Sequence, residues 1–234
     1  MDLAERLRGL DACAVSDALD SLGLPGAVAG IVPLWQGGSV AGPVRTIALR
    51  RLEEGETPPP GSHLGARTID SAAPGDVIVV ANAGRNDSAA WGGLLSAAAR
   101  RAGVAGVVVD GACRDVDEAA ELAFPMFGRS ATPISARGRT VEEAIDMTVA
   151  IGGVTVETGD LVIADRSGVA FISGGVVDDV LAAAERIVER ERSMQAELRA
   201  GATVQAVLDH RYESMLAGGS MERSEGGGGA GAVD

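Results

Sequence analysis

The sequence contains no lysine, because all 20 of its basic residues are arginines. A Schiff-base aldolase, a pyridoxal phosphate enzyme and a Walker-type nucleotide site each need a lysine, so these three kinds of site are excluded. Histidine is nearly as scarce, and His63 and His210 are too few for a His₃ zinc site. A reaction at a carbonyl group would therefore need a metal held by oxygen ligands, or arginine and backbone N–H groups, to stabilise negative charge.

The chain also has few cysteines, a net negative charge and no long apolar run. Two cysteines, Cys13 and Cys113, are too few for a disulfide framework, which favours a reducing compartment. The net charge of -13 argues against a nucleic-acid-binding surface. No window approaches the roughly 20 apolar residues of a membrane span, and the first residues lack a signal-peptide core. We expect a cytoplasmic protein that binds neither nucleic acid nor membrane.

The chain has 234 residues, of which 46% are hydrophobic, and this composition supports a substantial core. We expect a single domain over residues 1–217. Residues 218–234 are rich in glycine and low in complexity, so we expect them to be a disordered tail.

Residues 74–117 read as a strand, a glycine-rich turn, a helix and a second strand. The first strand is the β-branched run at 76–81, and the second is the apolar run at 104–109. Between them, residues 94–102 are rich in alanine and are followed by Gly103, a usual end for a helix. This pattern predicts a βαβ unit with a right-handed crossover.

Residues that could bind a ligand follow each of these two strands. Gly92 and Gly93 lead into the helix, where unpaired backbone N–H groups suit a carboxylate or a phosphate. Arg114 and Asp115 follow the second strand. An arginine can grip a carboxylate with two hydrogen bonds, and an aspartate can bind a divalent cation. The alternative, a surface ion pair that opens the next helix, fits the spacing equally well.

The rest of the chain alternates between short strands and helices, so we expect a layered α/β domain. One or two helices fall within residues 2–22, and a long helix covers about 176–199. His63 is expected in a loop or at a helix start rather than as a ligand, because no second His or Cys lies nearby. The other expected strands cover residues 44–52, 154–156, 161–164 and 169–172.

Six segments of the chain match one family in order and cover most of residues 10–200. They are VSDALDSLGL (Val15 to Leu24), AGPVRT (Ala41 to Thr46), PGDVIVV (Pro74 to Val80), WGGLLSAAARRAGVAGVVVDGACRD (Trp91 to Asp115), FPMF (Phe124 to Phe127) and ETGDLVIADRSGVAFI (Glu157 to Ile172). With them the sequence resembles the 4-hydroxy-4-methyl-2-oxoglutarate aldolases and their relatives, a family that also includes the regulator of ribonuclease activity A. The resemblance implies a ββα swivelling-type layered domain with a mixed sheet and a long C-terminal helix, assembled as a homotrimer or hexamer.

The resemblance also implies roles for particular residues. It places the substrate-binding arginine on Arg114 and the metal-binding aspartate on Asp115, with Mg²⁺ or Mn²⁺ as the cofactor. The backbone N–H groups that hold the carboxylate of a 2-oxo acid fall on Leu94 and Leu95. A glutamate from the C-terminal helix of a neighbouring subunit would be Glu191, for which a solvated surface position is the alternative.

The implied activity is metal-dependent C–C bond cleavage of a 2-oxo acid to give pyruvate, by retro-aldol cleavage or by decarboxylation of an oxaloacetate-like acid. Two alternatives stay open: a non-catalytic protein-binding regulator, and a relative recruited to another enolate reaction. The chain departs from the aldolase pattern at Gly93, where an acidic residue is usual. Without an acid at this position we expect slow aldol cleavage, which decarboxylation exceeds. The alternative is that glycine is needed there for close approach or for positive φ. Efficient aldol cleavage would indicate that another residue, such as Asp87 or Asp110, supplies the base.

Overall fold

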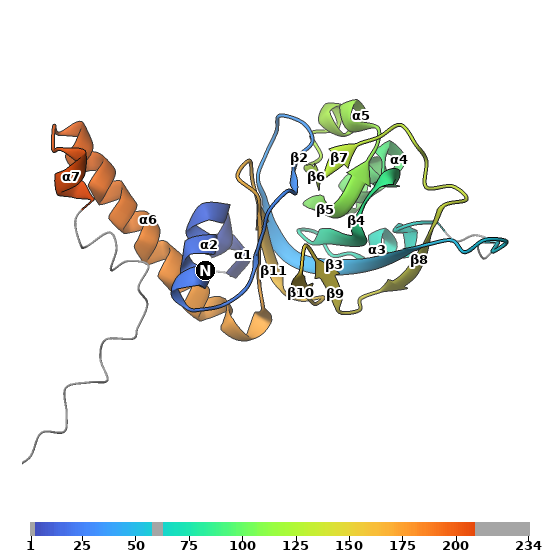
Figure 1. Ribbon diagram of the computed structural model, residues 1–234, viewed down its shortest axis with the longest axis horizontal. Helices are drawn as coiled ribbons and strands as arrows, with labels where there is room; N and C mark the ends of the chain where they lie inside the picture. Colours follow the sequence, from blue (N-terminus) through green and yellow to red (C-terminus); the bar gives the residue numbers. More distant parts are fainter. Residues whose placement is uncertain (1–2, 58–62, 209–234) are drawn as a thin grey trace, which may run out of the picture.

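The computed structural model describes residues 3–57 and 63–208 of the chain. The expected tail at 218–234 and His210 lie outside the described residues. Within the described part, two groups of helices pack on a ten-stranded mixed sheet (Figure 1). The expected α/β class, the mixed sheet and the long C-terminal helix are confirmed. The division into one domain and a tail stays a prediction.

Four neighbouring parallel strands form the centre of the sheet and include the predicted βαβ unit. Their order is β3 (Val40–Arg51), β4 (Val77–Trp91), β5 (Gly106–Cys113) and β6 (Met126–Gly128). The β-branched runs of β4 and β5 pair in register from Val77↔Gly106 to Ala81↔Asp110. The connecting helices are α3 (Ala66–Ser71), α4 (Gly93–Ala102) and α5 (Val116–Glu121).

Antiparallel strands extend this centre on both sides. The first half of β3 pairs with β11 (Leu161–Ala164), its second half pairs with β8 (Thr140–Ile145), and β11 pairs with β12 (Val169–Ile172). Five further strands of two or three residues complete the sheets. They are β1 (Ala27–Val28), β2 (Val32–Pro33), β7 (Ser130–Ala131), and the separate hairpin of β9 (Val149–Ile151) with β10 (Val154–Val156).

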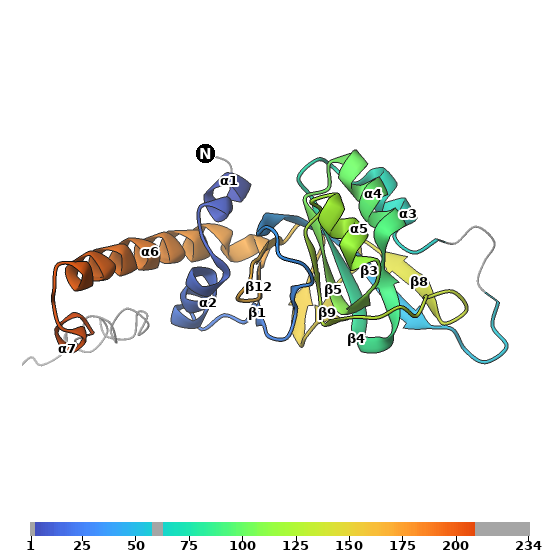
Figure 2. The ribbon, with the colours of Figure 1, turned by 90° about the horizontal axis from the view of Figure 1, so that it is seen from above.

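Two groups of helices lie at opposite ends of the molecule (Figures 1 and 2). At one end, α3, α4 and α5 cover the parallel strands, and their apolar side chains surround Phe124, Trp91 and Ile78. At the other end lie α1 (Leu3–Arg8), α2 (Ala12–Ser21) and α6 (Val177–Arg199). A 3₁₀ turn (Gly174–Val176) precedes α6, and α7 (Val204–Val207) follows it.

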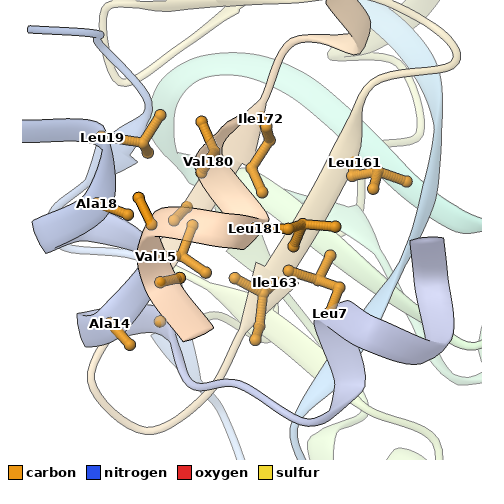
Figure 3. Close-up of a cluster of buried hydrophobic side chains, with 14 of the residues drawn as sticks. Leu7, Ala14, Val15, Ala18, Leu19, Leu161, Ile163, Ile172, Val180 and Leu181 are labelled. Carbon is orange, nitrogen blue, oxygen red and sulfur yellow. The ribbon is translucent and has the colours of Figure 1, made fainter. Parts of the chain in front are cut away.

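The second group of helices packs on β11 and β12 through aliphatic side chains (Figure 3). Val180 and Leu181 of α6 meet Val15 and Leu19 of α2 above Ile163 of β11, and all five are at most 2% exposed. The apolar residues at 177–188 recur at helical spacing, the usual pattern of a helix face that packs on a core. The second half of α6 extends beyond the sheet, so its charged residues do not contact the parallel strands.

Two central strands are longer than the sequence indicated. The expected glycine-rich turn after Ala81 is wrong, because β4 continues as an irregular strand to Trp91 and still pairs with β5. The pairing shifts register between Ala81 and Arg85, where Ala83 and Gly84 have φ of 52° and 68°. Strand β5 likewise continues past Val109 to Cys113. These extensions carry the backbone directly to Gly92 and Arg114.

No helix in the described part of the chain is both long enough and apolar enough to cross a membrane.

Candidate functional site

The end of β4 and the start of α4 are locked together by buried hydrogen bonds. Trp91 Nε1 donates to Ser96 Oγ at 3.0 Å, and Ser96 Oγ donates to the carbonyl oxygen of Gly92 at 3.0 Å. The backbone N–H of Ser96 donates to the same oxygen at 3.0 Å. Ser96 therefore fixes the direction in which the first turn of α4 points.

The Arg114–Asp115 dipeptide lies against this first turn because of the sheet register. Cys113 is paired with Trp91, and the N–H of Arg114 donates to the Trp91 carbonyl at 2.9 Å. Asp115 then adopts φ 57° and ψ 43°, a left-handed conformation that aspartate tolerates better than most residues. This turn aims its side chain at α4.

The Asp115 carboxylate caps a helix that is not its own. The sequence indicated a carboxylate at the start of α5, and Asp115 does occupy that N-cap position, but its side chain makes no capping bond there. Instead Oδ2 accepts from the N–H of Gly93 at 3.0 Å. A negative charge at this end of α4 is stabilised by the helix dipole. The reason is the left-handed backbone of Asp115, which turns the side chain from α5 to α4.

Arg114 and Asp115 also form the ion pair that the alternative interpretation predicts. Arg114 Nε donates to both Oδ1 and Oδ2 at 3.0 Å, and the side chains are 40% and 27% exposed. The ion pair uses only Nε of Arg114. Among the residues that the structure describes, no partner binds its two terminal nitrogens. The ion pair and a ligand-binding role are therefore compatible.

Two further donors point out of the same helix end. Within the described ranges, the N–H groups of Leu94 and Leu95 donate to no protein acceptor, as expected for the first turn of a helix. Gly93 and Ser96 on either side of them are already bonded. The structure thus brings the predicted amides together with Arg114 and Asp115 at one place, which is suited to an anionic ligand.

A largely apolar cavity of about 430 Å³ adjoins this helix end, between α3 and α4. Leu94 is 84% exposed at its edge. His63 precedes α3 and contributes to the wall, which confirms its expected position in a loop. The wall also includes Leu64, Ala66, Ile69, Leu95 and Ala98.

The backbone conformation at position 93 does not require glycine, but a side chain there would meet the carboxylate of Glu118. The φ angle of Gly93 lies outside the left-handed region, so the explanation by positive φ is wrong. A Cβ atom at Gly93 would lie 1.8 Å from Glu118 Oε2, and one at Gly92 would lie 2.8 Å from Asp115 Oδ2. The absence of a side chain at each glycine therefore leaves room for a neighbouring carboxylate, that of Glu118 at Gly93 and that of Asp115 at Gly92. Glu118 was not predicted as a site residue. It follows Asp115 by three residues, a spacing that places two side chains on one helical face.

Glu191 lies far from this site within one chain, since α6 is at the other end of the molecule (Figure 2). Partial burial raises the pKa of its carboxyl group, and the charges of Asp11 and Asp17 raise it further. Asp87 and Asp110, the alternative bases, are both engaged by arginines. Asp87 pairs with Arg51, while buried Asp110 accepts from Arg129 Nε at 2.5 Å.

The metal-ligating atoms at this site suit an ion that needs few protein ligands. Within residues 3–57 and 63–208, no three His, Cys, Asp or Glu side chains form a group that could hold a metal. Asp115 offers one carboxylate whose Oδ1 accepts only one hydrogen bond. Mg²⁺ and similar ions keep several waters and need only one or two protein carboxylates together with the substrate. The site therefore fits Mg²⁺ or Mn²⁺ better than zinc or a calcium cage.

Residues 12–171 match the family model described as "RraA-like: Aldolase/RraA". Because the match covers more than half of the chain, the protein belongs to the RraA-like aldolase family, as its motifs indicated. Several relatives bear the name of an aldolase, which supports a lyase at the level of the family.

Two relatives show how the similarity is distributed. A protein of Halalkalibacterium halodurans named "Putative 4-hydroxy-4-methyl-2-oxoglutarate aldolase" is 34% identical over 187 residues, which are 80% of this chain and 83% of that protein. Protein DlpA of Legionella pneumophila is 32% identical over 223 residues, 95% of this chain but 36% of that protein. The chain thus spans little more than a third of the length of DlpA.

Solved structures share the fold over most of its length. An uncharacterized protein from Pseudomonas syringae has a TM-score of 0.79 at 29% identity, covering 88% of this chain and 96% of that one. RraAS2 of Streptomyces coelicolor has a TM-score of 0.74 at 28% identity, covering 82% and 95%. It is described as an unusual member of the RNase ES inhibitor RraA protein family.

Proposed function

We propose that this protein is a divalent-metal-dependent lyase that cleaves a C–C bond of a 2-oxo acid and releases pyruvate. The observation that carries the proposal is the convergence, at the start of α4, of the Asp115 carboxylate with the Arg114 terminal nitrogens and two amides that have no partner among the described residues. Retro-aldol cleavage of a 4-hydroxy-2-oxo acid and decarboxylation of an oxaloacetate-like acid both pass through the enolate of pyruvate. One site that stabilises this enolate would serve both reactions.

The protein groups have distinct roles in this scheme. The N–H groups of Leu94 and Leu95, next to Gly92 and Gly93, bind the carboxylate of the 2-oxo acid. The terminal nitrogens of Arg114 bind the oxygen atoms on which negative charge develops, while its Nε keeps Asp115 in place. Asp115 would hold Mg²⁺ or Mn²⁺ together with water, and the cation would supply Lewis-acid stabilisation of the 2-oxo oxygen.

A coupled assay for pyruvate tests the proposal. Oxaloacetate and several 4-hydroxy-2-oxo acids are offered to the protein with Mg²⁺ or Mn²⁺ present. We expect pyruvate release from at least one of them above the rate without protein. The absence of release from the whole panel would contradict the proposal.

Glu191 enters the proposal as a residue supplied by a neighbouring subunit of a homotrimer or a hexamer. Its support is that the second half of α6 extends beyond the sheet of its own chain, and that partial burial raises the pKa of the Glu191 carboxyl group. We expect Glu191→Ala and Asp115→Ala subunits to be inactive alone and to regain activity when mixed. Mixed oligomers that form but stay inactive would place Glu191 outside the site.

A second candidate function is a non-catalytic regulator that binds a ribonuclease. It is favoured by the similarity to RraAS2, which is described as a member of a ribonuclease-inhibitor family. Retention of the Arg114–Asp115 pair with free donors favours catalysis instead. We place either activity in the cytoplasm on the strength of the cysteine content, and cell fractionation would test that location.

A further inference from the structure

The cavity between α3 and α4 begins at the helix end where the 2-oxo acid is expected to bind. Helix α4 lies between α5 and α3 and contacts both (Figures 1 and 2). The glycines at its start face Arg114 and Asp115, which precede α5. Leu94 and Leu95 contribute to the cavity wall on the α3 side and also present their N–H groups at the helix end. A ligand held by these amides therefore has the charged pair on one side and the cavity on the other.

This cavity is apolar and has the size of a ligand site. Its volume of about 430 Å³ falls within the usual range for small-molecule sites. The wall carries Leu94, Leu95 and Ala98 from α4, and Ala66 and Ile69 from α3. Each methylene group of a ligand that leaves water for such a wall strengthens binding about fourfold. The cavity thus favours a hydrocarbon extension of a ligand whose carboxylate is bound at the start of α4.

The charges around the cavity disfavour a second carboxylate on the ligand. Asp70 of α3 is exposed on the wall, and within the described ranges no arginine lines the cavity. Arg67, also in α3, bonds Glu142 at 2.7 Å. Arg137 belongs to a separate hollow that shares His63 with the cavity. A distal carboxylate would therefore meet the negative charge of Asp70 without an arginine to balance it.

We propose that this cavity determines substrate specificity by binding a hydrocarbon group at the far end of a 2-oxo acid. The inference rests on the proposed function, because the bound carboxylate at the start of α4 orients the rest of the molecule. Among 4-hydroxy-2-oxo acids, the preferred class carries an alkyl group beyond C4, and dicarboxylic acids of the same length are disfavoured. Asp70 sets this preference by its charge, and Ala98 sets it by leaving space.

Three 2-oxo acids test the cavity without any turnover. 2-Oxopentanoate ends in a methyl group where 2-oxoglutarate has its second carboxylate, and pyruvate lacks the extension. Isothermal titration calorimetry with Mg²⁺ present compares their binding to the full chain. We expect 2-oxopentanoate to bind about 10-fold more tightly than pyruvate, for two added methylene groups, and more tightly than 2-oxoglutarate. Equal or tighter binding of 2-oxoglutarate would overturn the inference.

Reversing the charge of Asp70 should change which acid binds better. Because Asp70 is exposed, Asp70→Arg does not repack the core. We expect the affinity for 2-oxoglutarate to rise about 10-fold, since an attractive charge replaces a repulsive one, while 2-oxopentanoate binds as it does to the wild type. Asp179→Arg makes the same change at an exposed position of α6, at the other end of the molecule (Figure 2). This control should leave both affinities unchanged.

Filling the cavity tests the hydrocarbon site directly. Ala98→Phe places an aromatic ring in the cavity, whereas Ala97→Phe places it at the next residue of α4, which is exposed and does not line the cavity. We expect Ala98→Phe to bind 2-oxopentanoate about 10-fold more weakly, with pyruvate affinity unchanged, and Ala97→Phe to match the wild type. Light scattering follows the assembly of both variants. Changed assembly of Ala98→Phe with unchanged ligand affinities would assign the cavity to a subunit contact and overturn the inference.

The outcomes separate this inference from the proposed function. A wild type that prefers 2-oxopentanoate but releases no pyruvate contradicts the lyase and supports the role of the cavity. A higher kcat/KM for 4-hydroxy-2-oxoglutarate than for 4-hydroxy-2-oxopentanoate keeps the lyase and overturns the hydrocarbon preference. Absence of binding of all three 2-oxo acids also overturns that preference.

Discussion

Replacing Asp115 by asparagine is expected to abolish measurable pyruvate release and to weaken Mn²⁺ binding. Asparagine tolerates the left-handed conformation of this position, and its amide oxygen can still accept from the N–H of Gly93. The change therefore removes the negative charge with little change in shape. A metal ion supplies several kcal/mol of charge stabilisation, and about 4 kcal/mol corresponds to roughly a 10³-fold loss of kcat.

Asp117→Asn is the matched control for Asp115→Asn. Asp117 is exposed in the first turn of α5, two residues further on, and contributes nothing to the helix end of α4. We expect this control to keep wild-type kcat and Mn²⁺ affinity. An Asp115→Asn protein that keeps both would show that Asp115 is only the cap of α4.

Replacing Arg114 by lysine should lower kcat/KM by about 10²-fold or more, the usual cost of removing one electrostatic stabiliser. One nitrogen of Arg114 bonds both oxygens of Asp115, and within residues 3–57 and 63–208 no partner binds its terminal nitrogens. Lysine keeps the charge but has a single nitrogen, so it cannot hold Asp115 and bind the substrate in the same way. We expect KM for the 2-oxo acid to rise and kcat to fall.

Arg101→Lys makes the same change at an exposed position in the last turn of α4 and should leave both constants unaltered. Equal kinetics for Arg114→Lys and the wild type would support the interpretation of Arg114 as part of a surface ion pair. Unfolding temperatures of the two variants separate a loss of chemistry from a loss of folding.

Local signals predicted the middle of each strand and helix better than their ends. The β-branched run before Asn82 and the alanines of α4 have strong preferences of their own, and Gly103 ends the helix with φ 84°. The continuation of β4 to Trp91 depends on irregular pairing with β5, and positive φ at Ala83 has no signal in the sequence. The end of β4 is therefore set by its pairing with a neighbouring strand, which local preference does not predict.

In the site, too, the residue types were predictable from the sequence and their arrangement was not. Glycines before α4 and an Arg–Asp pair after β5 indicated two donors and one acid, and strand register brings them together. The capping of α4 by Asp115 was not predictable, because it depends on the backbone conformation of one residue. The contact of Glu118 with Gly93 depends on how α5 packs beside α4. A contribution from a second subunit, as proposed for Glu191, has no local signature.

The most direct test of a metal-dependent lyase without lysine is pyruvate release in paired reactions with and without a chelator. The protein is treated with EDTA, assayed with the best substrate of the panel, and assayed again after Mg²⁺ or Mn²⁺ is restored. Because the chain has no lysine to form an imine, activity should vanish in EDTA and return with the cation. Full pyruvate release in EDTA would contradict the proposed chemistry.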